Sequence, residues 1–256
     1  MVKSAKSYSV PAIEKAITIL NGISKNGKMN INEIHSELNI PKTTVFVILN
    51  TLERHSLIEK HDDGKYVLGH GVLYWGMNYY QQSDIKQVAR PHLEKLVAGT
   101  PFTAHLAVMV NYQPVYIDKS EGNGFVRFAT IAGQALPLHL SGVGKALASG
   151  LTDEEISEAM SKTPDLDDSK RDQLADKLIE DVQFIRLHGY SIEDEQMEEG
   201  IRCIGAPIFG DNGRVIASIS ITALSKDLPA IKFQTIGEQV KETALRVSEE
   251  MGYQKR

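Results

Sequence analysis

The sequence contains a single cysteine, Cys203, and this scarcity excludes several kinds of site at once. An intrachain disulfide needs two thiols, and a structural zinc cluster usually draws on several cysteines. The eight histidines show no close paired ligand spacing. We therefore expect no metal site and no cofactor, and redox chemistry at Cys203 would need a second chain or a small thiol.

Long apolar runs are also missing from the sequence. No uninterrupted stretch approaches the roughly 20 apolar residues that a membrane-spanning helix needs, and Met1–Ser9 lacks the apolar core of a signal peptide. The cytoplasm is therefore the expected compartment, with no membrane partner. A hydrophobic fraction of 42% and a length of 256 residues suit a globular chain of two domains.

Positive charge is too scarce for a protein that is basic over its whole surface, because the formal net charge is −5. The two parts of the chain nevertheless differ. Residues 1–80 carry nine Lys and Arg against seven Asp and Glu, whereas residues 81–256 carry 19 against 26. Only the first part has a net positive charge, which would favour binding to a polyanion. The excess is so small that any DNA-binding prediction must depend on the pattern of residues.

The spacing of apolar residues predicts three helices near the N-terminus. The first begins near Pro11, and the second begins at Asn30 and Glu33, which have the spacing of a capping box. The third follows a tight break at residues 39–41 and extends for about 14 residues. Two short helices joined by such a turn are typical of a helix-turn-helix, whose second helix lies in the major groove of DNA.

The third helix has an apolar stripe of Val45, Ile48, Leu49 and Leu52, which leaves the opposite face free for DNA. The predicted DNA contacts on that face are Lys42, Thr43, Thr44, Phe46, Val47 and Asn50. Phe46 and Val47 are unusual for a solvated face. They either contact thymine methyl groups or pack under the wing or against a dimer partner.

A β-hairpin is predicted directly after the third helix. Residues 57–60 and 65–68 read as two strands around an Asp63-Gly64 turn, which would form a wing. Lys60 and Lys65 are placed to reach DNA phosphates, a contact that positions the protein without reading sequence. Three helices with a hairpin also serve as protein interaction modules, and this alternative stays open.

The remainder of the chain is predicted to be an α+β domain behind a connecting helix. Trp75, Tyr79 and Tyr80 in that helix suit either a dimer contact or packing on their own domain. A further helix begins at Ser83 or Asp84 and reaches Val97. Strands are expected at residues 103–110, 114–119, 126–129, 203–209 and 215–222, and helices at residues 141–149, 152–160, 169–188 and 229–251. This order favours an antiparallel sheet with flanking helices.

Five segments, in this order and spacing, resemble the IclR family of bacterial transcription regulators. They are Val10–Ala16, Ile40–Val45, Tyr66–Gly69, Leu138–Ala146, and Gly189-Tyr190 followed by Gly200–Pro207. The resemblance covers nearly the whole chain. It implies a winged helix-turn-helix DNA-binding domain in residues 1–70, a linker helix in 71–83 and a GAF-like effector-binding domain in 84–256. It also implies homodimers, or dimers of dimers, on palindromic double-stranded operators.

The same resemblance implies an effector site. Its residues would be Phe125 and Phe128 on the third strand of the domain, Leu136, Gly142, Val143, Glu193, Ile201, Cys203, Ser220 and Thr222. Backbone N–H groups at the start of the helix from Gly142 would favour a carboxylate, and apolar walls and two hydroxyls would complete a site for a small organic acid. The apolar members equally suit an ordinary core. Glu193 stands where the short-acid sensors of the family have Asp, so its longer side chain would shrink the cavity or bind a ligand hydroxyl.

The expected function is a DNA-binding transcription regulator whose operator affinity depends on a small organic acid. Members of the family usually carry His or Tyr and then Arg where this chain has Phe46 and Val47, so the operator sequence does not transfer. The alternative is a GAF-like thiol enzyme with Cys203 as nucleophile and His139 as base. We expect no enzyme, because a lone cysteine is usually a buried small apolar residue and no resolving cysteine is present.

Overall fold

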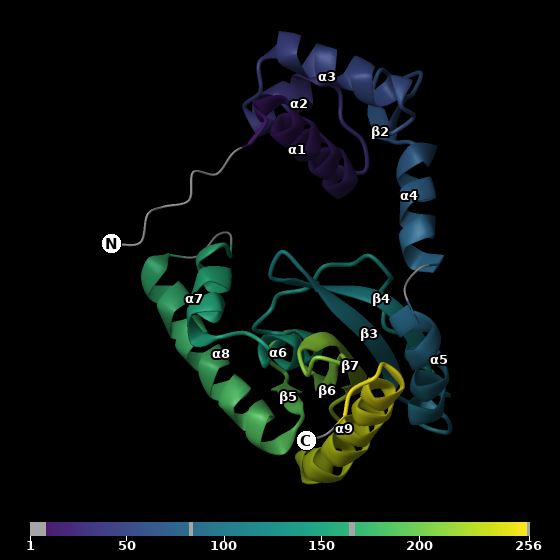
Figure 1. The fold of residues 1–256 in the computed structure, drawn as a ribbon, viewed down its shortest axis with the longest axis vertical. Coiled ribbons are helices and arrows are strands. Elements are labelled where there is room, and N and C mark those ends of the chain that lie inside the picture. Colours follow the sequence, from purple (N-terminus) through teal and green to yellow (C-terminus); the bar gives the residue numbers. More distant parts are fainter. Residues whose placement is uncertain (1–8, 82–83, 164–166, 255–256) are drawn as a thin grey trace. The chain divides into compact units, whose positions relative to one another are not determined.

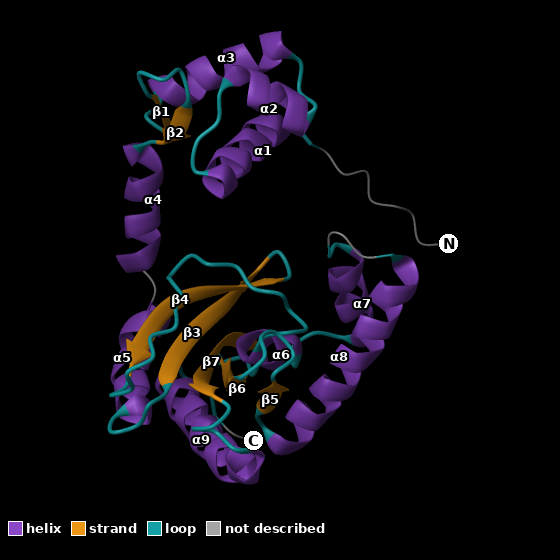
Figure 2. Cartoon of the chain, turned by 180° about the vertical axis from the view of Figure 1, so that it is seen from behind, coloured by secondary structure: helices purple, strands orange, loops and turns teal. Residues whose placement is uncertain are grey.

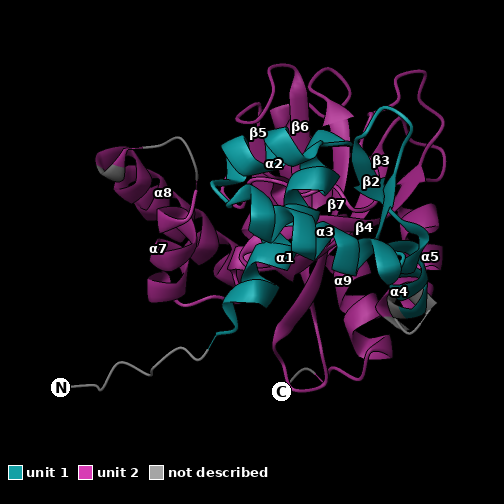
Figure 3. Ribbon diagram, turned by 90° about the horizontal axis from the view of Figure 1, so that it is seen from above, with its two compact units in different colours: residues 1–83 teal, residues 84–256 magenta. Residues whose placement is uncertain are grey.

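The computed structural model describes residues 9–81, 84–163 and 167–254. The chain folds into two compact units, residues 1–83 and residues 84–256, which are coloured separately in Figure 3. The predicted α+β class is confirmed, with a winged helix-turn-helix in the first unit and an antiparallel sheet with flanking helices in the second. Among the described helices, none is long and apolar enough to cross a membrane.

The described part of the first unit, residues 9–81, consists of helices and one hairpin (Figure 1). They are α1 (Pro11–Asn26), α2 (Ile31–Leu38), α3 (Lys42–Arg54), β1 (Ile58–Lys60), β2 (Tyr66–Leu68) and α4 (His70–Gln81). The predicted capping box is present, since the Asn30 side chain accepts from the N–H of Glu33 and the Glu33 carboxylate accepts from the N–H of Asn30. Asn39 ends α2 in the left-handed conformation (φ 51°), which turns the chain into α3.

The core of the first unit is formed by the inward stripes of its helices. Ile19 and Ile23 from α1, Ile34 from α2, and the four predicted stripe residues of α3 are buried together. Tyr66 joins the wing to this core, and its backbone pairs with Met29 in both directions. The helix-turn-helix and the wing are therefore one packed body, which holds α3 in a defined orientation.

The second unit is a five-stranded antiparallel sheet with helices on both faces. Its elements are α5 (Asp84–Val97), β3 (Thr103–Val110), β4 (Gln113–Glu121), α6 (Gly142–Ala148), α7 (Asp153–Ser161), α8 (Asp168–His188), β5 (Ser191–Asp194), β6 (Ile201–Phe209), β7 (Val215–Leu224), the 3-10 turn η1 (Ala230–Lys232) and α9 (Phe233–Glu250). The strand order is β4-β3-β7-β6-β5, and every neighbouring pair is antiparallel (Figure 2).

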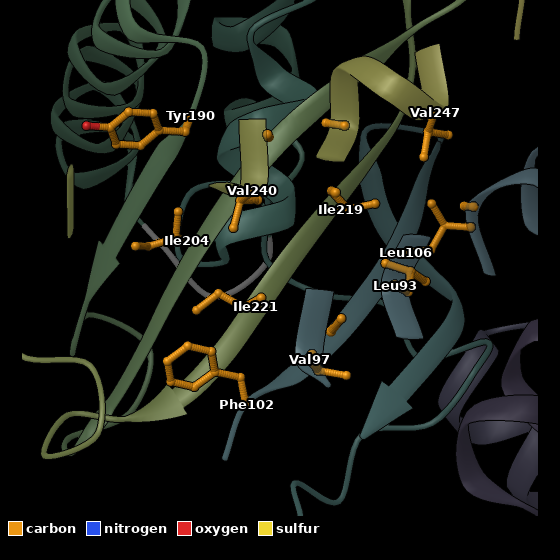
Figure 4. Close-up of a cluster of buried hydrophobic side chains, with 14 of the residues drawn as sticks. Leu93, Val97, Phe102, Leu106, Tyr190, Ile204, Ile219, Ile221, Val240 and Val247 are labelled. Atoms are coloured by element: carbon orange, nitrogen blue, oxygen red, sulfur yellow. The ribbon is translucent and has the colours of Figure 1, made fainter. Parts of the chain in front are cut away.

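One face of this sheet is apolar and is covered by α5 and α9. Ile204, Ile219 and Ile221 from β6 and β7 form one buried cluster with Leu93 of α5 and Val240 of α9, and all five are labelled in Figure 4. Side chains alternate between the two faces of a strand, so the residues beside these isoleucines face the other way. The opposite face therefore receives Cys203, Ser220 and Thr222, and α6 packs on it.

The strand expected at residues 126–129 is wrong, because this segment is an irregular loop. The Lys119 ammonium on β4 donates to the carbonyl oxygens of Phe128 at 2.6 Å and Thr130 at 3.3 Å. These two carbonyl oxygens therefore accept hydrogen bonds from a side chain, whereas in a sixth strand they would accept from the backbone N–H groups of β4. Phe125 and Phe128 consequently lie in a loop and not on a strand.

The structure differs from the sequence prediction in two further places, besides strand and helix ends that shift by one or two residues. The edge strand β5 was not expected, since its four residues are too short to show a clear alternation. The last helix begins at Phe233 and not at Pro229, because residues 230–232 form a 3-10 turn. Neither difference changes the order of the predicted elements.

A buried lysine ties α6 to the rest of the second unit. The Lys145 side chain is 1% exposed, and its ammonium lies 2.8 Å from the Asp181 carboxylate of α8. The same ammonium donates to Gln196 Oε1 and to the Ile192 carbonyl. An ammonium taken out of water needs such partners, so α6, α8 and the β5–β6 connection are fixed together.

We predict that Asp181→Ala lowers the free energy of unfolding by about 3 kcal/mol, because it leaves a buried ammonium without its carboxylate. The double variant with Lys145→Met should recover most of this loss, since it also removes the charge. Lys177→Ala, which removes an exposed neighbour 3.6 Å from Asp181, is the control and should change stability by less than about 1 kcal/mol. Urea denaturation measures the wild type, the double variant, each of its two single variants and Lys177→Ala. A double variant as unstable as the sum of its single changes contradicts the proposed pairing.

Candidate DNA-binding helix and effector face

The outward face of α3 carries the residues predicted to contact DNA. Lys42, Thr43, Phe46, Val47 and Asn50 are exposed, and Thr44 is half-buried. The first turn of α3 has no side-chain cap, so its free backbone N–H groups accompany Lys42 at this end. The face combines a cation, hydroxyls and an amide, which are the groups that bind phosphates and base edges.

The two lysines predicted on the wing occupy different environments. The Lys60 ammonium is exposed at the end of β1, 5.7 Å from the centre of the Tyr66 ring. The Lys65 ammonium pairs with Glu33 Oε1 at 2.7 Å, and this hydrogen bond raises the pKa of Lys65 and lowers the pKa of Glu33. Lys65 therefore joins the wing to the capping box of α2, a partner that sequence spacing could not reveal.

The polar face of the second unit is defined by Glu193 on β5, Cys203 on β6, Ser220 and Thr222 on β7, and His105 on β3. Strand register places Glu193 beside Cys203 and Cys203 beside Thr222, with Ser220 beside His105. Four of the five side chains are almost fully buried, and Cys203 is partly exposed. Hydroxyl, thiol, carboxyl and imidazole groups are thus gathered on one side of one sheet.

His105 is at the centre of a hydrogen-bonded chain on the polar face. Its Nε2 lies 2.8 Å from Thr130 Oγ1, its Nδ1 lies 3.4 Å from Thr222 Oγ1, and its ring stacks on Tyr116 at 4.4 Å. Burial, helped by the positive charge of Lys119, lowers the pKa of His105 to about 3. The imidazole is therefore neutral at physiological pH, when one ring nitrogen donates and the other accepts.

The Glu193 carboxylate is held by the turn that follows β5. Its Oε1 accepts the N–H of Gln196 at 2.6 Å and the N–H of Met197 at 3.0 Å. Gln196 is also the side chain that accepts from Lys145, so the buried lysine supports this turn. The carboxylate reaches the polar face in a fixed orientation, next to the thiol of Cys203.

The start of α6 is pressed against the same strands. Ser191 Oγ donates to the Gly142 carbonyl at 2.7 Å, and Ser218 Oγ donates to the Val143 carbonyl at 3.0 Å. A side chain at position 142 would approach Cys203 Cβ to 2.9 Å, which explains the glycine there. Among the backbone N–H groups at the start of this helix, which were expected to favour a carboxylate, that of Gly144 already donates to Ser141 Oγ.

The remaining residues predicted for the effector site are spread more widely. Leu136 is buried with Tyr116 and Val143, and Ile201 is half-buried at the start of β6. Phe128 is half-buried in the loop before α6, whereas Phe125 in the same loop is fully exposed. Register and burial therefore bring together Glu193, Cys203, Ser220 and Thr222, and leave Phe125 outside this group.

His105, Tyr116 and Thr130 were not singled out from the sequence. A signal existed for His105, because Thr103 and His105 are two residues apart in an otherwise apolar strand and so share a face. Thr130 gave no signal, since its contact with His105 depends on the path of an irregular loop.

The thiol-enzyme alternative finds little support in these surroundings. Burial, with the nearby Glu193 carboxylate, raises the pKa of Cys203 to about 12, so the thiol stays protonated at neutral pH. Among the described residues, no hydrogen bond links Cys203 to His139. His139 instead lines a cavity of about 470 Å³ beside Tyr112 and Lys162.

A winged helix-turn-helix unit followed by an α+β unit with a buried polar face is an architecture of bacterial transcriptional regulators. Comparison with known proteins agrees with this class. Residues 12–62 match the IclR helix-turn-helix domain, and residues 77–249 match the bacterial transcriptional regulator IclR C-terminal family. The chain therefore belongs to the IclR family, as the resemblance predicted.

Individual relatives span almost the whole chain. This chain is 31% identical over 245 residues to the HTH-type transcriptional repressor AllR of Escherichia coli (strain K12). The matched region covers 94% of this chain and 90% of the relative. Among solved structures, an IclR family regulator from Brucella abortus superposes with a TM-score of 0.84 at 21% identity, covering 98% of this chain and 95% of the other. The Thermotoga maritima IclR structure gives a TM-score of 0.63 at 27% identity, with 95% and 99% covered.

We predict that His105 makes the stability of the second unit depend on pH. Its pKa is lower in the folded than in the unfolded chain, so the unfolded state binds the extra proton between pH 6.5 and about 3. Above pH 6.5 the free energy of unfolding is unaffected by His105. As the pH falls below 6.5, His105 lowers the free energy of unfolding, by about 3 kcal/mol at pH 4. Urea titrations of wild type and His105→Gln from pH 7.5 to 4 measure the difference. The exposed His61→Gln is the control, and a His105→Gln curve parallel to wild type contradicts the assignment.

Proposed function

We propose that this chain is a DNA-binding transcriptional repressor whose operator affinity is controlled by a small organic acid. The observation that carries the DNA-binding part is the outward face of α3, where Lys42 and Thr43 begin a helix held in place by a helix-turn-helix core. Residues 1–70 would bind DNA, residues 71–83 would link the two domains, and residues 84–256 would bind the effector. Repression is proposed because the relative named above, AllR of Escherichia coli, is a transcriptional repressor.

The proposed DNA contacts divide into positioning and reading groups. Lys42 and Lys60 would contact phosphates, while Thr43, Thr44, Phe46, Val47 and Asn50 would face the bases. Lys65 is a weaker member of this set, because its ammonium is already paired with Glu33.

The proposed operator is palindromic double-stranded DNA, bound by a homodimer or a dimer of dimers in the cytoplasm. Leu73, Tyr74, Trp75 and Met77 on α4 are all exposed large apolar side chains. Such a cluster on one short helix supports α4 as a contact between two copies. A two-fold protein would match two half-sites of opposite orientation.

The proposed effector site is the polar face of the second unit. Ser220 and Thr222 would supply hydroxyls, the N–H groups at Gly142 and Val143 would meet the carboxylate of the acid, and Leu136 would supply an apolar wall. Glu193 accepts hydrogen bonds, so it suits an acid that also carries a hydroxyl group. Ile201, Cys203 and Phe128 complete the proposed site, and no catalytic step is assigned to it.

We predict that Lys42→Ala weakens DNA binding and reduces the slope of log K against log salt concentration by about 1, because one phosphate contact is lost. Lys65→Ala should reduce that slope less than Lys42→Ala does and should lower the stability of the first unit, since its ammonium is paired with Glu33. Gel-shift titrations over a range of salt concentrations, with thermal unfolding of each variant, separate the two roles. An unchanged slope for Lys42→Ala contradicts the proposed phosphate contact.

We predict that Ser220→Ala keeps its DNA affinity and loses its response to effector. Thermal shift measurements with a panel of small carboxylates, including hydroxy acids, sugar acids and aromatic acids, identify ligands that stabilise the wild type. Ser157→Ala, on the exposed side of α7, is the control and should respond as the wild type does. Full stabilisation of Ser220→Ala by an acid that stabilises the wild type contradicts the proposed site.

A further inference from the structure

Phe46 and Val47 form an apolar pair on the outward face of α3. Their side chains are 54% and 63% exposed. The core of the first unit takes Val45, Ile48, Leu49 and Leu52 from the same helix, so Phe46 and Val47 are not needed for its packing. Packing under the chain's own wing is therefore wrong, which leaves contact with thymine methyl groups or with a dimer partner.

The neighbours of this pair are the groups expected to meet DNA. Residues four apart lie on the same face of a helix, so Lys42 precedes Phe46, Thr43 precedes Val47, and Asn50 follows Phe46. The apolar pair is thus enclosed by a cation, a hydroxyl and an amide. A partner must offer negative charge and hydrogen-bonding groups around a small apolar feature.

We infer that Phe46 and Val47 contact the 5-methyl groups of thymine in the major groove, and so determine operator specificity. The 5-methyl group of thymine is the one apolar feature among the base edges of that groove. Phosphates on either side supply the negative charge that Lys42 needs. This inference rests on the proposed DNA-binding function, and it predicts an operator with thymines at the positions under the first two turns of α3.

The test uses a duplex that the full-length protein selects from a random-sequence library. One version of this duplex is synthesised with thymine and the other with deoxyuridine, which lacks only the methyl group and keeps every hydrogen-bonding group. Wild type should bind the deoxyuridine version more weakly, by roughly fourfold for each contacted methyl, from the transfer free energy of one such group. Replacement of one thymine at a time by deoxyuridine then identifies the thymines whose methyl groups contribute to affinity. These thymines should lie at equivalent positions in the two half-sites.

Variants assign the methyl contacts to the two side chains. Phe46→Ala and Val47→Ala should each bind the thymine duplex more weakly. In each variant the ratio of the affinity for the thymine duplex to the affinity for the deoxyuridine duplex should fall toward one. Ile17→Ala removes a similarly exposed apolar side chain, 51% exposed on α1, and should keep the wild-type ratio. If Phe46→Ala binds too weakly to titrate, Phe46→Leu replaces it and should give an intermediate ratio.

The possible outcomes separate this inference from the function it rests on. Wild-type protein that selects a duplex but binds its two versions equally overturns the inference and leaves the DNA-binding function intact. Protein that selects no sequence overturns the DNA-binding function itself. Variants that keep the wild-type ratio but change the sedimentation mass assign Phe46 and Val47 to a contact between two copies, which also overturns the inference.

Discussion

The second unit depends on the alternation of side chains across its antiparallel sheet. Ile204, Ile219 and Ile221 bury the sheet against α5 and α9, and this apolar face provides most of the core. The same alternation turns Cys203 and Ser220 to the opposite side. The sheet thus carries a polar face without opening the core, because the apolar and polar side chains occupy different faces. A shift of register by one residue would exchange them.

The first unit also separates core residues from exposed residues, here on two faces of one helix. In α3, the buried stripe and the exposed stripe alternate with the helical period, so Val45 and Leu49 hold the helix while Lys42, Phe46 and Asn50 are exposed. The ion pair between Lys65 and Glu33 joins the wing to α2. The orientation of α3 therefore depends on the buried core of the first unit and on the wing that this ion pair holds in place.

Much of this architecture was predictable because its causes are local. The capping box at Asn30 and Glu33 and the apolar periods of α3 can be read from residues close in sequence, and both predictions are confirmed. The failures depend on contacts distant in sequence or on irregular backbone. Lys119 takes the carbonyls of Phe128 and Thr130, which removes the strand expected at residues 126–129. The contact of His105 with Thr130 likewise depends on a loop whose path no periodicity indicates.

The central claim is that the outward face of α3 enters a duplex groove and reads sequence there. The most direct measurement is repeated selection of the full-length protein against a random duplex library at several salt concentrations, followed by sequencing of the bound pools. The account predicts enrichment of one inverted repeat that persists as salt rises, since base contacts outlast phosphate attraction. Bound pools that share no sequence at any salt concentration would contradict it.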